Sequence, residues 1–167
     1  MKNIIPIFFL FTHLVLSAQQ APDFTVTDTE NKVHRLYADY LDQGKVVVFK
    51  IFFVNFPPCN AIAPSVQQKY VQWGSGTGNV QFIEMTNKIG DTNPYVIQYK
   101  NTHGLTFPSI SADGGALTAI IPYMNGLFGI WSGTPMFAVI APNKSVHYDV
   151  LFNNLDNVIM AAGGQVA

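Results

Sequence analysis

The sequence contains one cysteine, Cys59, and its surroundings carry the strongest chemical signal in the chain. Cys59 follows two prolines at the start of a segment with helical spacing, directly after an apolar run that ends at Val54. Unpaired backbone N–H groups at a helix start, together with the positive end of the helix dipole, stabilise a thiolate. Cys59 is therefore the candidate reactive group, and the alternative is that it is a small buried hydrophobic residue.

The composition excludes several classes of protein. A single thiol cannot form an intramolecular disulfide or a multi-thiolate zinc or iron–sulfur site. The 9 Lys+Arg and 10 Asp+Glu residues give a formal net charge of −1, without the basic character of a nucleic-acid-binding protein. With 167 residues, 49% of them hydrophobic, one globular domain is expected. We expect no nucleic-acid partner, no metal and no cofactor.

The first 18 residues have the layout of a secretory signal peptide. Lys2 gives a basic start, residues 4–16 are mainly apolar, and Ser17 and Ala18 offer a small-residue cleavage site. A retained membrane anchor is the weaker alternative, because a span needs roughly 20 apolar residues. We expect residues 1–18 to be removed and residues 19–167 to form a periplasmic or secreted domain without a membrane anchor.

The elements that must position Cys59 alternate along the chain. A hairpin is predicted over residues 21–36, and Gly44 then ends a short helical turn. Apolar and alternating runs predict strands at residues 46–54, 80–85, 107–110, 136–140 and 146–150. Helical spacing predicts helices at residues 59–73, 93–99, 116–123 and 151–162, the first kinked by Pro64. This order predicts an α/β domain with a mixed sheet flanked by helices.

Two separated motifs resemble the thioredoxin-like superfamily. The run Pro57-Pro58-Cys59 is similar to the end of its Cys-Pro-Pro-Cys site, and Pro64 is similar to its helix proline. The run 133–135, Gly-Thr-Pro, is similar to its cis-proline loop. The resemblance is closest to the exported thiol-disulfide oxidoreductase or redoxin branch, the alkyl hydroperoxide reductase–thiol-specific antioxidant-like proteins. It implies a thioredoxin-like fold that binds exported protein thiols or disulfides, or a peptide segment, through Phe56, Pro57, Pro58, Trp131, Thr134 and Pro135.

The sequence departs from the family motif at Phe56. The resemblance implies an attacking cysteine at this position, and it makes Cys59 the second, resolving cysteine. Disulfide exchange needs attack by one thiolate and resolution of the mixed disulfide by another, so one thiol completes only half of the cycle. We therefore expect monothiol or impaired redox activity. The alternative is a non-catalytic binding module that uses a groove formed by Phe56, Trp131 and Pro135.

Lys50 is a second departure, six residues before Phe56. The resemblance implies a buried acid at this position that assists proton transfer. A buried ammonium is costly unless it is paired, so Lys50 would pair with an anion such as the Cys59 thiolate. The alternative is that Lys50 points to the sheet edge or extends its ammonium into solvent.

Two rival enzyme classes fit the residues less well. A peroxiredoxin needs only one reactive cysteine, but its motif has Thr or Ser where this chain has Phe56, and it needs an arginine near the thiolate. The only arginine is Arg35, in the predicted hairpin. A Cys–His protease would need a histidine beside Cys59, and His103 and His147, in a predicted loop and hairpin, are poor candidates.

Overall fold

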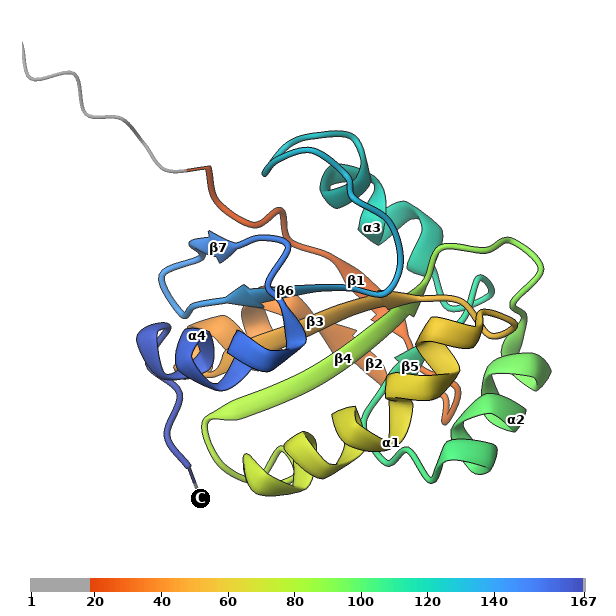
Figure 1. Cartoon of the computed structure of the whole chain (residues 1–167). Coiled ribbons are helices and arrows are strands. Elements are labelled where there is room, and N and C mark those ends of the chain that lie inside the picture. Colours follow the sequence, from red (N-terminus) through yellow and green to blue (C-terminus); the bar gives the residue numbers. More distant parts are fainter. Residues whose placement is uncertain (1–18, 167) are drawn as a thin grey trace, which may run out of the picture.

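The computed structural model describes residues 19–166, which form an α/β domain around a five-stranded sheet (Figure 1). The expected signal peptide, residues 1–18, lies outside the described residues. The strand order is β5-β4-β3-β6-β7, where β3 is Val46–Phe52, β4 is Val80–Thr86, β5 is Ser109–Ile110, β6 is Met136–Ile140 and β7 is Val146–His147. The predicted fold class is confirmed.

The sheet is mixed because β3 pairs in parallel with β4 on one side and antiparallel with β6 on the other. Every residue of β3 and β4 is buried. These strands lack the polar–apolar alternation of a half-exposed strand because both faces of the sheet are covered. The same coverage places any charged residue of β3 or β4 in the interior.

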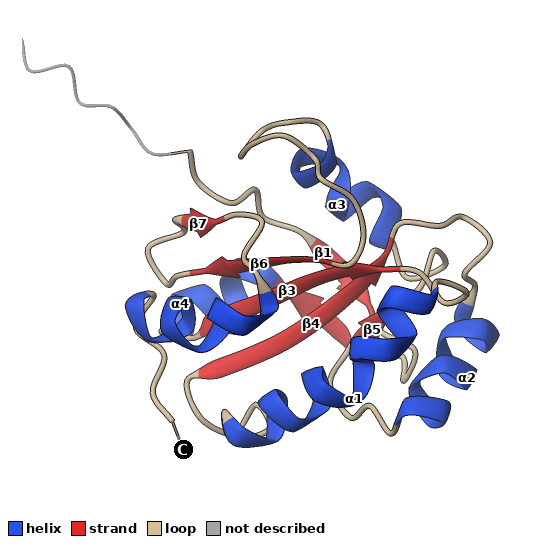
Figure 2. Cartoon of the chain, viewed as in Figure 1, coloured by secondary structure: helices blue, strands red, loops and turns tan. Residues whose placement is uncertain are grey.

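Within residues 19–166, four α-helices accompany the sheet (Figure 2). Apolar residues of α1, α2 and α4 join the core cluster on one face of the sheet, which contains Cys59. Residues of α3 and of the N-terminal hairpin join the cluster on the other face. The helices are α1 (Pro57–Gln72), α2 (Asn93–His103), α3 (Ala116–Met124) and α4 (Leu155–Ala161).

The predicted hairpin forms a separate two-stranded sheet of β1 (Thr25–Thr27) and β2 (Val33–Arg35). Two short helical segments follow, η1 (Leu36–Tyr40) and η2 (Leu41–Gln43). Gly44 ends them with φ of 75°, a left-handed conformation that glycine adopts without steric cost. The turn predicted to end at Gly44 is thus confirmed.

Several element ends differ from the prediction. The second helix does not stop at Tyr99 but continues to His103, where Gly104 ends it in the left-handed region. The expected C-terminal helix begins only at Leu155, after a separate short turn, η3 (Phe152–Asn154). No helix in the described part of the chain is long and apolar enough to cross a membrane.

Candidate functional site

Cys59 lies in the first turn of α1, directly after the turn that follows β3. Pro57 and Pro58 occupy the first positions of the helix, where a missing backbone N–H costs nothing. The helix closes its first turn with a hydrogen bond of 3.0 Å from the Asn60 N–H to the Phe56 carbonyl. The side chain of Cys59 is 0% exposed, so an external disulfide cannot reach its sulfur without a local opening.

Burial opposes the expected stabilisation of a Cys59 thiolate. Burial raises the pKa of the Cys59 thiol above its ordinary value of 9.0. A backbone hydrogen bond from Phe53 and the charge of Lys50 lower this pKa, but they do not outweigh the loss of solvent. The sequence correctly predicted that Cys59 lies at a helix start, but it did not predict that the thiol is fully buried.

Lys50 is neither at the sheet edge nor exposed. Its side chain is 2% exposed on the central strand, and its Nζ lies 2.7 Å from Oε2 of Glu84 on β4. The main partner of the ammonium is therefore a carboxylate, and its influence on Cys59 is electrostatic. Lys50 Nζ also donates to the Tyr99 hydroxyl at 3.2 Å, and Ser109 Oγ donates to Glu84 Oε1 at 2.7 Å.

This buried polar network ends beneath the candidate site. The Tyr99 hydroxyl lies 3.3 Å from the backbone carbonyl oxygen of Cys59, to which it donates. Sequence reasoning missed Glu84, although one signal was available. Each of the two longest buried strands carries a single charged residue, and parallel pairing places Lys50 directly beside Glu84.

Phe56 stacks on Phe53 with 4.5 Å between ring centroids, and it packs against the core cluster that contains Cys59. The ammonium of Lys88, from the loop after β4, lies 4.9 Å from the centre of the Phe53 ring. Both aromatic rings remain partly exposed. The position implied for an attacking cysteine thus holds an apolar, partly exposed side chain.

The Gly-Thr-Pro loop meets the same region from the other side. The Thr134–Pro135 peptide bond is cis. Because Met136 pairs with Ile51, Pro135 lies beside the end of β3, where the chain leaves toward Phe56. Asn87 Nδ2 donates to Thr134 Oγ1 at 2.9 Å, which links this loop to the loop after β4. We call the residues of these three converging segments the Phe56 surface: Phe53, Phe56, Asn87, Lys88, Thr134 and Pro135.

A buried carboxylate holds the turn before Phe56 in place. Asp91 Oδ2 accepts hydrogen bonds from the Val54 N–H at 2.9 Å and from Thr86 Oγ1 at 2.6 Å. The Asn87 N–H in turn donates to the carbonyl of Phe52 at 2.9 Å. These bonds between the ends of β3 and β4 fix the rim of the site.

Trp131 and Phe56, expected to share a groove, pack against different core clusters. It packs, with Phe128, against the core cluster on the opposite face of the sheet from Cys59. Phe56 packs against the cluster that contains Cys59. Phe56 is close in sequence to the Cys59 motif and Trp131 to the Gly-Thr-Pro loop, and these two motifs lie near each other. The sheet nevertheless separates the two core clusters against which Phe56 and Trp131 pack.

A cavity of about 240 Å³ lies on the α2 side of Phe56. Asn60 contributes a buried side-chain oxygen that has no hydrogen-bond partner within the described residues. The lining of this cavity is uncharged apart from the titratable His103 ring. It consists of Val54, Asn55, Asn60, Tyr95, Gln98, Tyr99, Thr102 and His103.

The rival enzyme classes gain no support from these positions. Burial lowers the pKa of His103, and its ring stacks edge-on to Tyr99 rather than bonding Cys59. His147 is exposed on β7, at the far edge of the sheet. Arg35 lies on β2, where it pairs with Asp39 at 3.5 Å. Among residues 19–166, no cluster of three or more His, Cys, Asp or Glu side chains could hold a metal ion.

Comparison with known proteins agrees with the fold. The sequence profile of the AhpC/TSA family matches residues 17–148. A thiol:disulfide interchange protein from Chlorobium tepidum superposes with a TM-score of 0.69 at 23% identity, covering 87% of this chain and 97% of that one. A secreted disulfide oxidoreductase from Mycobacterium tuberculosis gives 0.62 at 17% identity, covering 83% and 95%. At these identities the likeness shows the fold alone, and no curated protein matches the sequence.

Proposed function

Because the chain belongs to the AhpC/TSA family, we propose that it is an exported redoxin-type protein that binds a polypeptide segment but does not complete a thiol–disulfide cycle unaided. The observation that carries this proposal is the replacement of the attacking position by Phe56 above a fully buried Cys59. Reduction of a disulfide by such a site needs one accessible thiolate to attack and a second thiol to release the product. This chain has only the second.

The Phe56 surface supports the binding part of the proposal. Its two stacked rings offer a partly exposed apolar face, and aromatic side chains are frequent anchors at protein interfaces. The Thr134–Pro135 loop borders that face and is held there by Asn87. The polar cavity next to Phe56 adds free hydrogen-bonding groups, among them the Asn60 oxygen. Together these features suit an extended polypeptide segment of an exported protein.

Insulin reduction by dithiothreitol tests the catalytic half of the proposal. We expect the wild-type protein to leave the rate at background and Phe56→Cys to accelerate it. In that variant the introduced thiolate attacks the insulin disulfide and releases one insulin thiol. Cys59 then displaces the second insulin thiol and leaves a protein disulfide, which dithiothreitol reduces.

The matched control is Phe56→Cys/Cys59→Ser, which keeps the attacking thiol without the resolving one and should lose most of the gain. Wild-type turnover equal to that of Phe56→Cys would contradict the proposal. An accelerated rate only in Phe56→Cys would support it, because the scaffold would then be intact and only the first thiol missing.

Monothiol exchange at Cys59 is the second candidate, because the charge of Lys50 and the Phe53 backbone bond offset part of the rise in the thiol pKa that burial causes. It requires an opening of the first turn of α1, followed by attack of the thiolate on a disulfide such as oxidised glutathione. The product is a mixed disulfide at Cys59 plus one glutathione thiolate. Mass spectrometry of the native protein after this incubation tests it, since the proposed binding role predicts an unmodified chain.

Export is tested by expressing the full chain in a Gram-negative bacterium and sequencing the N-terminus of the protein recovered from the periplasm and medium. A chain that begins at Gln19 supports export and cleavage after Ala18. A chain retained in the cytoplasm with residues 1–18 intact would contradict it.

A further inference from the structure

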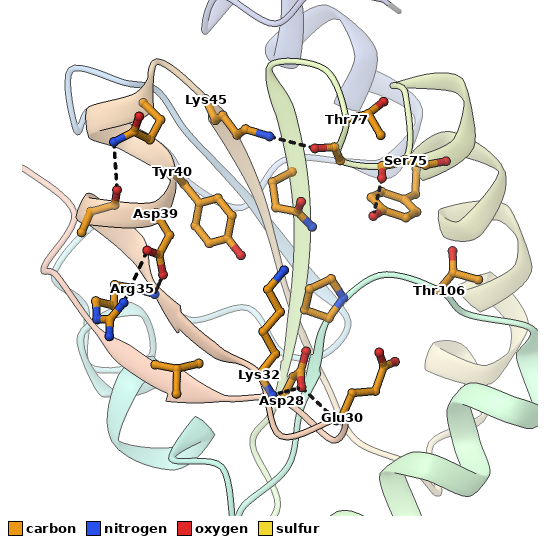
Figure 3. Close-up of a pocket in the computed structure, with 17 residues that line it drawn as sticks. Asp28, Glu30, Lys32, Arg35, Asp39, Tyr40, Lys45, Ser75, Thr77 and Thr106 are labelled. Carbon is orange, nitrogen blue, oxygen red and sulfur yellow. Dashed lines mark hydrogen bonds and ion pairs between the residues drawn. The ribbon is translucent and has the colours of Figure 1, made fainter.

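A second cavity lies away from the Phe56 surface and shares no residue with it. Its volume is about 750 Å³, which is within the range of small-molecule sites. Figure 3 shows that its walls come from the N-terminal hairpin, the short helical segments after it, β4, the loop after α1 and the segment before β5. Cys59 does not line this cavity, so a ligand bound there would occupy a separate site.

The acidic side chains that line this cavity are already bound to other groups. Asp28 is buried and accepts hydrogen bonds from the N–H groups of Glu30 and Lys32, at 2.8 and 2.9 Å. Its second oxygen is bound by His34 Nε2 at 2.8 Å. Glu30 pairs with Lys100 at 2.7 Å. Both carboxylates therefore already have hydrogen-bond or ion-pair partners within the protein.

The third acid of the lining, Asp39, is also compensated. It pairs with the guanidinium of Arg35 and accepts the N–H of the same residue at 2.8 Å. Arg35 and Asp39 thus neutralise each other at one rim of the cavity, and neither adds a free charge to it.

Two ammonium groups of the lining have no such compensation. Among residues 19–166, no carboxylate lies within 4.0 Å of the side-chain nitrogen of Lys32 or Lys45. Lys45 Nζ donates to the neutral carbonyl of Gly76 at 2.8 Å, which leaves its charge unbalanced. Lys32 extends from the hairpin into the cavity beside Tyr40, and Lys45 lies at the opposite end (Figure 3). The cavity thus offers two ammonium groups without a carboxylate partner, at two separated points.

Between the two lysines, the walls are held by internal hydrogen bonds. The Tyr40 hydroxyl is bound to His34 Nδ1, and the other nitrogen of His34 is bound to Asp28. The Tyr70 hydroxyl donates to the carbonyl of Ser75 at 2.8 Å. Because these groups are fixed before any ligand arrives, little ordering of the wall would be needed on binding.

We propose that this cavity binds a small organic anion with more than one acidic oxygen group, a carboxylate or a phosphate, held between Lys32 and Lys45. Charge-assisted hydrogen bonds from ammonium groups to carboxylate or phosphate oxygens are stronger than neutral ones, which makes such anions the favoured class. The rings of Tyr40 and Tyr70, which also line the cavity, offer surfaces for the carbon skeleton of the ligand. A neutral or cationic ligand would leave the two ammonium groups uncompensated.

The test is a titration of the ¹⁵N-labelled protein with citrate or with inorganic phosphate at constant ionic strength, with glycerol as the uncharged control. Saturable shifts of the backbone amides of Lys32, Lys45, Gly76 and Thr77 with citrate alone assign a polycarboxylate. If phosphate gives the same shifts as citrate, the site recognises acidic oxygen groups of either kind. Glycerol is expected to shift none of these amides.

Variants distinguish a site from general attraction of anions. Lys32→Gln and Lys45→Gln should each weaken binding by ~10-fold, the loss of one charge-assisted hydrogen bond. Lys144→Gln, whose side chain lies outside the cavity lining, should bind as the wild type does. The proposal is overturned if neither anion gives saturable shifts at millimolar concentration, or if Lys144→Gln weakens binding as much as Lys32→Gln.

Discussion

Lys50 Nζ lies 2.7 Å from Glu84 Oε2 on neighbouring strands in the middle of the sheet, where the two side chains are 2% and 0% exposed. Parallel pairing of β3 with β4 brings the two residues into register. Lys50 Nζ also lies 5.2 Å from the ring centre of Phe52 and 5.6 Å from that of Tyr99. The pair forms a charged point inside an otherwise apolar core, beneath the helix turn that carries Cys59.

Lys50→Met should destabilise the protein by about 3–5 kcal/mol, because it leaves the Glu84 carboxylate buried without its counter-ion. Lys50→Met/Glu84→Gln removes both charges and keeps an acceptor for Ser109, so it should recover most of that loss. Urea unfolding measures both. Arg35→Gln is the control, since Arg35 and Asp39 form an exposed ion pair, with side chains 55% and 34% exposed, and its loss should change stability by about 0–1 kcal/mol. Equal stability of Lys50→Met and wild type would contradict a stabilising role for this ion pair.

Cys59 should react with iodoacetamide at least ~100-fold more slowly in the native protein than in the urea-unfolded chain, because its sulfur is reached only through a local opening. Burial raises the thiol pKa, so the native rate should still increase as the pH passes 9.0. Phe56→Ala should accelerate the reaction by uncovering the cluster that contains Cys59, whereas Val71→Ala, at an exposed position of α1, should not. A native rate that reaches its plateau near neutral pH would instead indicate a stabilised thiolate.

Asp28→Asn should cost about 1–3 kcal/mol at neutral pH, since the carboxylate binds two backbone N–H groups and His34. These hydrogen bonds hold the pKa of folded Asp28 below its ordinary value of 3.8, against the opposing effect of burial. The ionised carboxylate therefore stabilises the fold fully above about pH 5, and this stabilisation is lost as the pH falls below 3.8 toward the folded pKa.

Urea unfolding from pH 7 down to pH 2.5 checks the prediction for Asp28. The difference in unfolding free energy between wild type and Asp28→Asn should stay constant near neutral pH and shrink in the acid range. A difference that does not change with pH would mean that the ionised form of Asp28 contributes nothing to folding stability.

The fold class could be predicted from the sequence because its main signals are local. Runs such as residues 46–52 are apolar apart from Lys50, as expected for a strand covered on both faces, and the turn at Gly44 needs a residue that tolerates positive φ. Helix ends were less accurate. The second helix continues past Tyr99 because it ends where Gly104 provides a left-handed cap, and no apolar periodicity marks that point.

The sequence by itself determined that this chain has one thiol, at a helix start, in a motif whose first cysteine is Phe56, and that two motifs far apart resemble one family. Only the tertiary structure decided the states of these groups. It buried Cys59, paired Lys50 with Glu84, and placed Trp131 against the other core from Phe56. The physical reason is that burial and charge pairing depend on which strands are neighbours and which face a side chain occupies. Strand pairing over long sequence separations sets both properties, and local residue patterns do not encode them.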